Sequence, residues 1–152
     1  MSWLDEEEMR AWRGLVEVFN ALQATVDAEL EAEHGISGGD YAVLVTLSES
    51  PDRAMRMCDL AGRLHLSPSG LTRRLDGLVR DGLVARRTAT DDRRVTKAVL
   101  TAKGLRLLER AAPSHVATVR RHFIDRLSRE QICQLGVAMD ACRCDADDLA
   151  IP

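Results

Sequence analysis

The stretch MCDLAGRLHLSPSGLTRRLDGLVRDGLVARRTATDDRRVTKAVLTAKG, residues 57–104, decides the fold of this chain. Ser67 and Pro68 separate two groups of apolar residues at helical spacing. The groups are Leu60, Ala61 and Leu64, then Leu71, Leu75, Leu78 and Val79. Ser67 can accept a hydrogen bond from a free N–H at the start of the second helix, and proline suits the first helical position. The spacing therefore predicts two short helices joined by a turn.

The second helix carries hydroxyl and guanidinium groups opposite its leucines. Its exposed side presents Ser69, Thr72, Arg73 and Asp76, with Arg74 at the flank. Most charged residues on helices are simply solvated, but hydroxyls and guanidiniums on the second helix of such a motif are typical of contacts with bases and phosphates. The candidate DNA-binding residues of this helix are Ser67, Ser69, Thr72, Arg73 and Arg74.

A two-stranded hairpin is expected after this helix. Gly82 ends the helix, and residues 83–88 and 95–100 are rich in β-branched side chains, which favours strands. The polar residues 89–94 are too charged to pack and are expected at the tip of the hairpin. Arg86, Arg87 and Lys97 on the strands are expected either at DNA phosphates or in solvent. Together these elements predict a winged helix-turn-helix.

Long helices are predicted on both sides of this motif. Residues 9–30 hold one apolar stripe: Met9, Trp12, Leu15, Val16, Phe19, Leu22, Val26 and Leu30. This helix is expected to end near His34 and Gly35. Ser37 and Asp40 fit a cap for a further helix through Leu47, and residues 50–53 are expected to form a loop.

The chain after the wing is also expected to be helical. Thr101 can cap a helix whose expected inward positions are Leu105, Leu108, Ala112, Val116, Val119 and Phe123. Pro113 predicts a kink rather than a break, because the stripe resumes in phase. Ser128 and Gln131 fit a capping box for a last helix.

The predicted fold is mainly α with a small β-hairpin wing, in a single domain over residues 1–152. Residues 40–104 form the winged helix-turn-helix in this interpretation, and residues 1–36 and 105–152 form dimerisation helices. The terminal helices carry more apolar surface than a small winged motif can cover, which favours a homodimer. The alternative is a monomer in which these helices pack back on the motif.

Positive charge is concentrated on the winged motif, although the chain has a net charge of −3. Residues 1–62 have a balance of −9, residues 63–110 of +7 and residues 111–152 of −1. This distribution fits a surface that binds double-stranded DNA. No run is long and apolar enough to span a bilayer, and the acidic stretch at residues 5–8 lacks the basic start of a signal peptide. We therefore expect a cytoplasmic protein without membrane contact, whose four cysteines are thiols.

Residues 66–87, LSPSGLTRRLDGLVRDGLVARR, followed by Asp91-Asp92-Arg93-Arg94 and Leu100-Thr-Ala-Lys-Gly104, resemble the MarR family of bacterial transcriptional regulators. The wing signature of that family is Asp-x-Arg and a basic residue, then a strand that ends in Leu-Thr-x-x-Gly. The chain matches it at Asp91, Arg93, Arg94, Leu100, Thr101 and Gly104. The resemblance extends over nearly the whole chain, because a long helix precedes the motif and two helices follow it.

The resemblance implies a dimer with interlocked terminal helices that binds a near-palindromic operator, most simply as a repressor. It implies that Arg93 enters the minor groove, that Asp91 holds the Arg93 guanidinium in position, and that Arg94 is the neighbouring basic residue of the wing. It also implies a cleft for a small aromatic or phenolic anion between the dimer helices and the winged motif. Trp12 is the candidate ligand contact, with packing in the dimer core as its alternative.

Other classes of function have weaker support. No phosphate-binding loop, nucleophile elbow or metal-ligand spacing is present, so neither an enzyme nor a cofactor is expected. Cys142 and Cys144 could sense oxidants or a metal, as in a thiol- or metal-responsive regulator, or could be an incidental pair. A dimeric winged-helix module that acts through a protein partner is a further alternative, against which the basic cluster argues.

Overall fold

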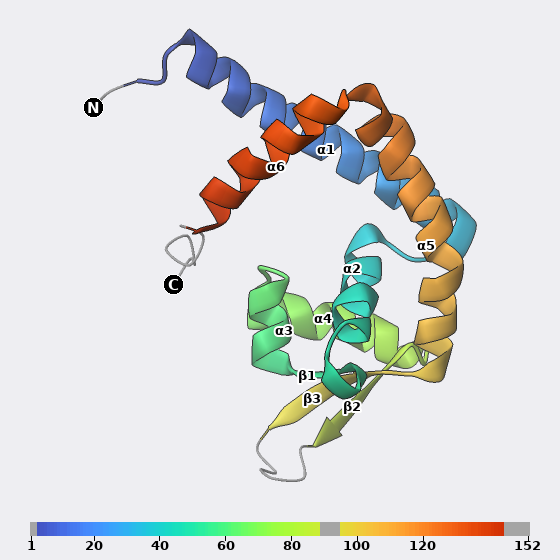
Figure 1. Cartoon of the computed structure of the whole chain (residues 1–152). Coiled ribbons are helices and arrows are strands. Elements are labelled where there is room, and N and C mark those ends of the chain that lie inside the picture. Colours follow the sequence, from blue (N-terminus) through green and yellow to red (C-terminus); the bar gives the residue numbers. More distant parts are fainter. Residues whose placement is uncertain (1–2, 89–94, 145–152) are drawn as a thin grey trace.

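The first helix begins and ends where side chains and backbone satisfy its free polar groups. The Asp5 carboxylate accepts hydrogen bonds from the N–H groups of Glu7 and Glu8, and the Glu8 carboxylate accepts one from the Asp5 N–H. Helix α1 spans Glu6–His34 and ends at Gly35, which has a φ of 68°. The predicted end is confirmed. This computed structural model describes residues 3–88 and 95–144 (Figure 1).

The winged part follows, with its elements in the predicted order. It contains α2 Gly38–Ser48, a 3-10 turn Pro51–Arg53, β1 Ala54–Arg56, α3 Met57–Arg63, α4 Pro68–Arg80, β2 Val84–Thr88 and β3 Thr96–Leu100. The capping box of α2 is present: the Ser37 hydroxyl accepts from the Asp40 N–H, and the Asp40 carboxylate accepts from the Ser37 N–H. Gly82, with a φ of 72°, follows the last turn of α4.

The sheet has one strand more than the sequence predicts. Its order is β1-β3-β2, with both pairs antiparallel. A strand of three residues is too short to show an alternating pattern of apolar and polar residues. Strand β1 is therefore recognised only by its pairing with β3. The expected loop at residues 50–53 is the 3-10 turn Pro51–Arg53 with Ser50 before it.

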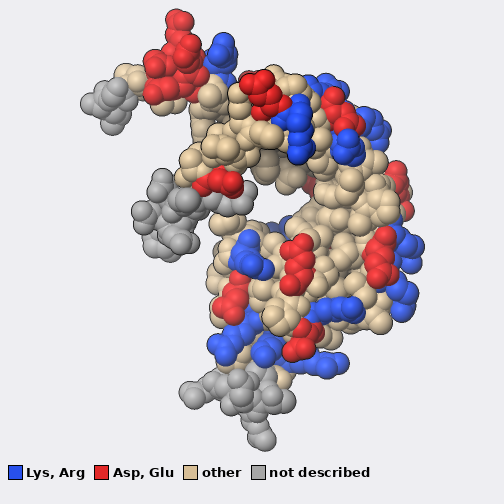
Figure 2. All heavy atoms as spheres, viewed as in Figure 1, with Lys and Arg blue, Asp and Glu red and all other residues tan. Residues whose placement is uncertain are grey.

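Two helices complete the chain: α5 Ala102–His122 and α6 Arg129–Cys144, with a 3-10 turn Ile124–Arg126 between them. The predicted caps at Thr101 and Ser128 are both present. Pro113 lies inside an unbroken α5. Helix α5 leads away from the winged part beside α1, and α6 turns back from its far end, which leaves a hollow between α6 and the winged part (Figures 1 and 2).

The predicted inward face of α5 is partly wrong. Val116 is 54% exposed, whereas Leu107, Ala111 and Thr118 are buried. The helical stripe identifies an apolar face but does not show which partner covers it. In this chain the side of α5 that meets α1 carries the polar Thr118. A search for apolar residues at helical spacing does not detect this residue.

One hydrophobic core joins the winged part to α1 and α5. Its fully buried large side chains are Leu30, Val43, Leu44, Leu47, Leu60, Leu71, Leu75 and Val84. The N-terminal half of α1 is exposed, since Trp12 and Phe19 each have an exposed fraction of 57%. On α6, Val137 is 72% exposed. The apolar stripe predicted for α1 is therefore covered at its C-terminal end and uncovered over its first turns.

Gly104 marks a close approach of α5 to the sheet, which leads to a test of the fold. A Cβ on Gly104 would lie 2.2 Å from the Leu83 carbonyl oxygen and 2.8 Å from Leu100 Cδ1. We expect Gly104→Ala to lower the free energy of unfolding by roughly 1–3 kcal/mol, because the backbone has to shift. Urea denaturation at fixed protein concentration measures this loss.

Gly62→Ala is the matched control, because no heavy atom lies within 4 Å of the added Cβ. Alanine there is expected to be neutral or to stabilise α3 by up to about 1 kcal/mol. Equal unfolding midpoints for the Gly104 variant and the parent would contradict the packing described.

Candidate nucleic-acid interface

The start of α4 is built as the sequence predicts. The Ser67 hydroxyl oxygen accepts a hydrogen bond from the Gly70 N–H at 3.1 Å, and Pro68 occupies the first helical position. The Ser69 hydroxyl lies 3.2 Å from that of Ser67. Both serines are exposed. Short hydroxyls thus surround the N-terminus of the helix, where backbone N–H groups favour phosphate.

The two long faces of α4 differ as predicted. Leu71, Leu75 and Leu78 are buried, whereas Thr72 and Arg73 are exposed. Thr72 donates its hydroxyl hydrogen to the Pro68 carbonyl at 2.8 Å, so its oxygen is left to accept from a ligand. The Arg73 guanidinium has no hydrogen bond or ion pair with another described residue. This face therefore offers a cation that is unpaired among the described residues and a hydroxyl oxygen that can still accept a hydrogen bond.

Arg74 is placed differently from the other candidates of this helix. Its guanidinium donates to Asp40 Oδ1 at 3.3 Å and to the Ser37 hydroxyl at 3.2 Å. It lies over Gly39, where an added Cβ would be 2.1 Å from Arg74 Nη1. Arg74 thus fastens α4 to the start of α2 and is half-buried rather than on the open face.

Arg86 fastens the sheet to α4 from the other side. It lies 2.8 Å from Asp76 Oδ1 and donates to the Thr72 carbonyl at 3.2 Å. Sequence reasoning placed Arg86 at phosphates or in solvent. Its contacts show instead that it sets the position of β2 relative to α4.

Three cations stand in one row across the sheet. Lys97 on β3 pairs in register with Arg56 on β1 and with Arg87 on β2. Residues directly opposite in a sheet point to the same side, and like charges there repel. Such a row is expected where the cations share an external anion. Lysine and arginine side chains gather around this end of the molecule in Figure 2.

A hollow of about 530 Å³ lies between the sheet and α4, lined in part by Arg56, Thr72, Arg86 and Thr96. Sequence reasoning missed Arg56, because it lies on the undetected strand β1. The available signal was its place at the end of the charged stretch 52–56, directly before the first helix of the motif. Arg56 is the cation of this row that lines the hollow. Lys97 and Arg87 alternate with Thr96 and Arg86 along their strands, so they point to the other face of the sheet.

The remaining predicted residues lie on other elements or outside the described part of the chain. Asp91, Arg93 and Arg94 lie outside the described residues. Trp12 is on the first half of α1 and is exposed. Cys58, Cys133 and Cys142 are exposed free thiols, and the side chain of Cys144 is not described.

Two groups with shifted pKa values lie between α2 and α5. Burial raises the pKa of Tyr41 and lowers the pKa of His115. Their rings are 4.5 Å apart. Within residues 3–88 and 95–144, no cluster of three or more His, Cys, Asp or Glu side chains could hold a metal. In the same residues no helix is both long and apolar enough to cross a membrane.

Comparisons with known proteins agree with this architecture. The family model described as the MarR family matches residues 36–96. The HTH-type transcriptional repressor YetL of Bacillus subtilis is 35% identical over 108 residues, which are 69% of this chain and 65% of YetL. The match thus spans just under two thirds of the length of that relative.

Two solved structures match over most of the chain. AbsC, a MarR family transcriptional regulator from Streptomyces coelicolor, has a TM-score of 0.88 at 39% identity and covers 98% of both chains. Sco3205, a MarR family transcriptional regulator from the same organism solved in complex with DNA, has a TM-score of 0.88 at 36% identity over 94% of this chain and 89% of its own. The chain therefore belongs to the MarR family of transcriptional regulators.

Proposed function

We propose that this chain is a homodimeric, sequence-specific DNA-binding repressor that a small aromatic or phenolic anion releases from its operator. The observation that carries the DNA-binding part is the exposed face of α4, with Ser69, Thr72 and Arg73, next to the hollow that Arg56 lines. Base-reading groups on a helix next to phosphate-binding cations are what sequence-specific binding needs. The relatives YetL, named a repressor, and Sco3205, solved with DNA, support this choice.

The uncovered half of α1 supports the dimer. Trp12, Leu15 and Phe19 are each 47–57% exposed on neighbouring turns of one helix. Val116 on α5 and Val137 on α6 are exposed as well. Contiguous apolar surface of this kind marks a protein interface. A second copy of the same helices has the matching chemistry, and a two-fold pair would carry two α4 helices.

The alternatives differ in what they leave unexplained. A module that acts only through a protein partner does not need a row of three cations opposite one another. A thiol- or metal-responsive regulator would rest on Cys142 and Cys144, of which only Cys142 has a described side chain, an exposed free thiol. For the wing we keep the expectation that Arg93 enters the minor groove beside Asp91 and Arg94.

The first functional prediction concerns the operator. A two-fold dimer with two α4 helices should select a near-palindrome whose half-sites are about one helical turn, roughly 34–36 Å, apart. Selection from random duplexes followed by footprinting measures this directly. Protection of one asymmetric half-site by a monomer would contradict both the dimer and the docking of α4.

A second prediction separates Arg73 from Arg74. Arg73→Ala should cost roughly 1–3 kcal/mol of binding free energy and relax the base preference at one position of each half-site. Arg74→Ala should weaken binding to all duplexes alike and lower the melting temperature, because it loosens α4 from α2. Fluorescence anisotropy with single-base operator variants measures both effects.

Arg129→Ala is the control for Arg73, because Arg129 is exposed at the start of α6. It removes the same charge and should leave affinity and preference unchanged. An Arg73 variant with the affinity and selectivity of the parent would show that the base-reading face is wrongly assigned.

The third prediction concerns the effector. A ligand changes DNA affinity only if it binds the DNA-competent and incompetent dimers unequally. We expect salicylate to weaken the operator complex, and we expect Trp12→Phe to shift that response while the fold is kept. Titration of the complex by anisotropy, with a neutral solute at matched concentration, measures the release.

Trp3→Phe leaves Trp12 as the only tryptophan, so fluorescence of that variant reports on α1 alone. If salicylate-like anions fail while a mild oxidant or a metal ion releases the operator, the small-molecule hypothesis is wrong and Cys142 with Cys144 becomes the sensor.

A further inference from the structure

A second basic cavity lies where the end of α1, the turn after α4 and the start of α5 meet. Its volume is about 430 Å³. Ile36, Leu83 and Leu107 contribute apolar lining, and each of them is at most 8% exposed. Lys103, Arg106 and Arg110 of α5 contribute the cations. The cavity thus combines a firm apolar floor with a cationic rim, the arrangement of a small-molecule site.

The three cations share one face of α5 because they are three and four residues apart. Lys103 Nζ donates to the Asp81 carbonyl at 2.7 Å, which fixes one edge of the rim against the end of α4. Among the described residues that line the cavity, Asp81 is the only acidic one, and its carboxylate lies 3.2 Å from Arg80 Nε. The rim therefore has an excess of positive charge.

Arg106 and Arg110 differ from the arginines farther along α5. Arg120 pairs with Asp125 at 2.7 Å, and Arg121 lies 3.5 Å from Glu29. Neither Arg106 nor Arg110 makes a hydrogen bond or ion pair with another residue of the described ranges 3–88 and 95–144. Two like charges four residues apart on a helix repel. An anion between them would remove this repulsion.

We propose that this cavity binds a small dianion with a short apolar body, such as a phosphate monoester or a dicarboxylate. Two guanidiniums side by side match the paired oxygens of phosphate or carboxylate, and Lys103 supplies a third positive charge. The apolar body would pack on Ile36, Leu83 and Leu107. A concave space of this size suits a small molecule better than the convex backbone of a duplex.

The cavity lies away from the apolar part of α1 that supports the proposed dimer. The exposed apolar residues of α1 lie at Trp12–Phe19, whereas the cavity uses His34 at the other end of the helix. Fifteen residues of α-helix, from Phe19 to His34, span roughly 22 Å. The site needs neither DNA binding nor the effector cleft, so it can be tested on the free protein.

The test is calorimetric titration of the full chain at pH 8 with phenyl phosphate and with inorganic phosphate, and with phenol as the neutral control. We expect saturable binding of phenyl phosphate, weaker binding of inorganic phosphate, and none of phenol. The double variant R106Q/R110Q should weaken phenyl phosphate binding by roughly tenfold or more, since it removes two charge-assisted contacts.

R126Q/R129Q is the matched control, because it removes the same two charges from exposed positions around the start of α6. That variant should bind phenyl phosphate like the parent. Melting curves of all variants, and operator affinity measured separately, distinguish a failure of this site from a failure of the proposed function.

Absence of saturable binding, or equal binding by R106Q/R110Q and R126Q/R129Q, would overturn the proposal. A loss of duplex affinity in R106Q/R110Q without any binding of phenyl phosphate would show that the cavity contacts the DNA backbone, and would overturn it too.

Discussion

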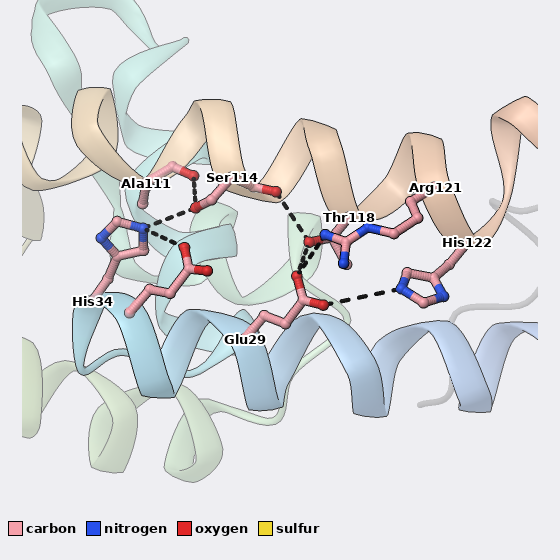
Figure 3. Close-up of polar contacts among 8 residues, drawn as sticks. Glu29, His34, Ala111, Ser114, Thr118, Arg121 and His122 are labelled. Carbon is pink, nitrogen blue, oxygen red and sulfur yellow. Dashed lines mark hydrogen bonds and ion pairs between the residues drawn. The ribbon is translucent and has the colours of Figure 1, made fainter.

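The architecture depends on a polar contact between the two long helices. Thr118 of α5 is 1% exposed and donates its hydroxyl hydrogen to the carboxylate of Glu29 on α1, while its oxygen lies 3.0 Å from the Ser114 carbonyl (Figure 3). Arg121 and His122 approach the same carboxylate at 3.5 and 4.0 Å. A second contact joins His34 of α1 to the Ser114 hydroxyl at 2.8 Å. Because a buried polar group is costly without its partner, these contacts allow one register of α1 on α5 and disfavour others.

This register matters because α5 is the element that connects the sheet to α1. Gly104 lets its first turn lie against Leu83, and Thr101 donates its hydroxyl hydrogen toward the Gly82 and Leu83 carbonyls at 2.8 and 3.0 Å. The winged part therefore has a fixed attachment to the lower end of α5. The exposed apolar half of α1 lies beyond the other end of this contact. If two copies of the chain paired through that half of α1, the pairing would set the distance between their two α4 helices.

The sequence predicts local structure well wherever one residue satisfies one nearby backbone group. The caps at Ser37, Ser67, Thr101 and Ser128 and the turns at Gly35 and Gly82 are all confirmed. Contacts between distant segments leave no such signal. The pairing of Arg74 with Asp40, of Arg86 with Asp76, and of β1 with β3 spans many residues, and each depends on the finished fold.

The same limit applies to the candidate site. Helical spacing correctly separated Arg73, which is open, from the buried leucines, but spacing alone could not show that Arg74 turns toward α2. The row of Arg56, Lys97 and Arg87 needed the register of three strands, one of them too short to detect. The wing residues Asp91, Arg93 and Arg94 rest on the resemblance to the family, because they lie outside the described residues.

These contacts also restrict how binding could be regulated. Helix α4 is held by Arg74 on the α2 side and by Arg86 on the sheet side, so its angle within the winged part has little freedom. A ligand acting on DNA affinity would then have to move whole winged parts relative to each other rather than bend α4 inside one of them. Such motion passes through the contact of α1 with α5, where Glu29 and Thr118 resist sliding. The long helices are therefore the part of the molecule in which differential ligand binding could alter the spacing of two recognition helices.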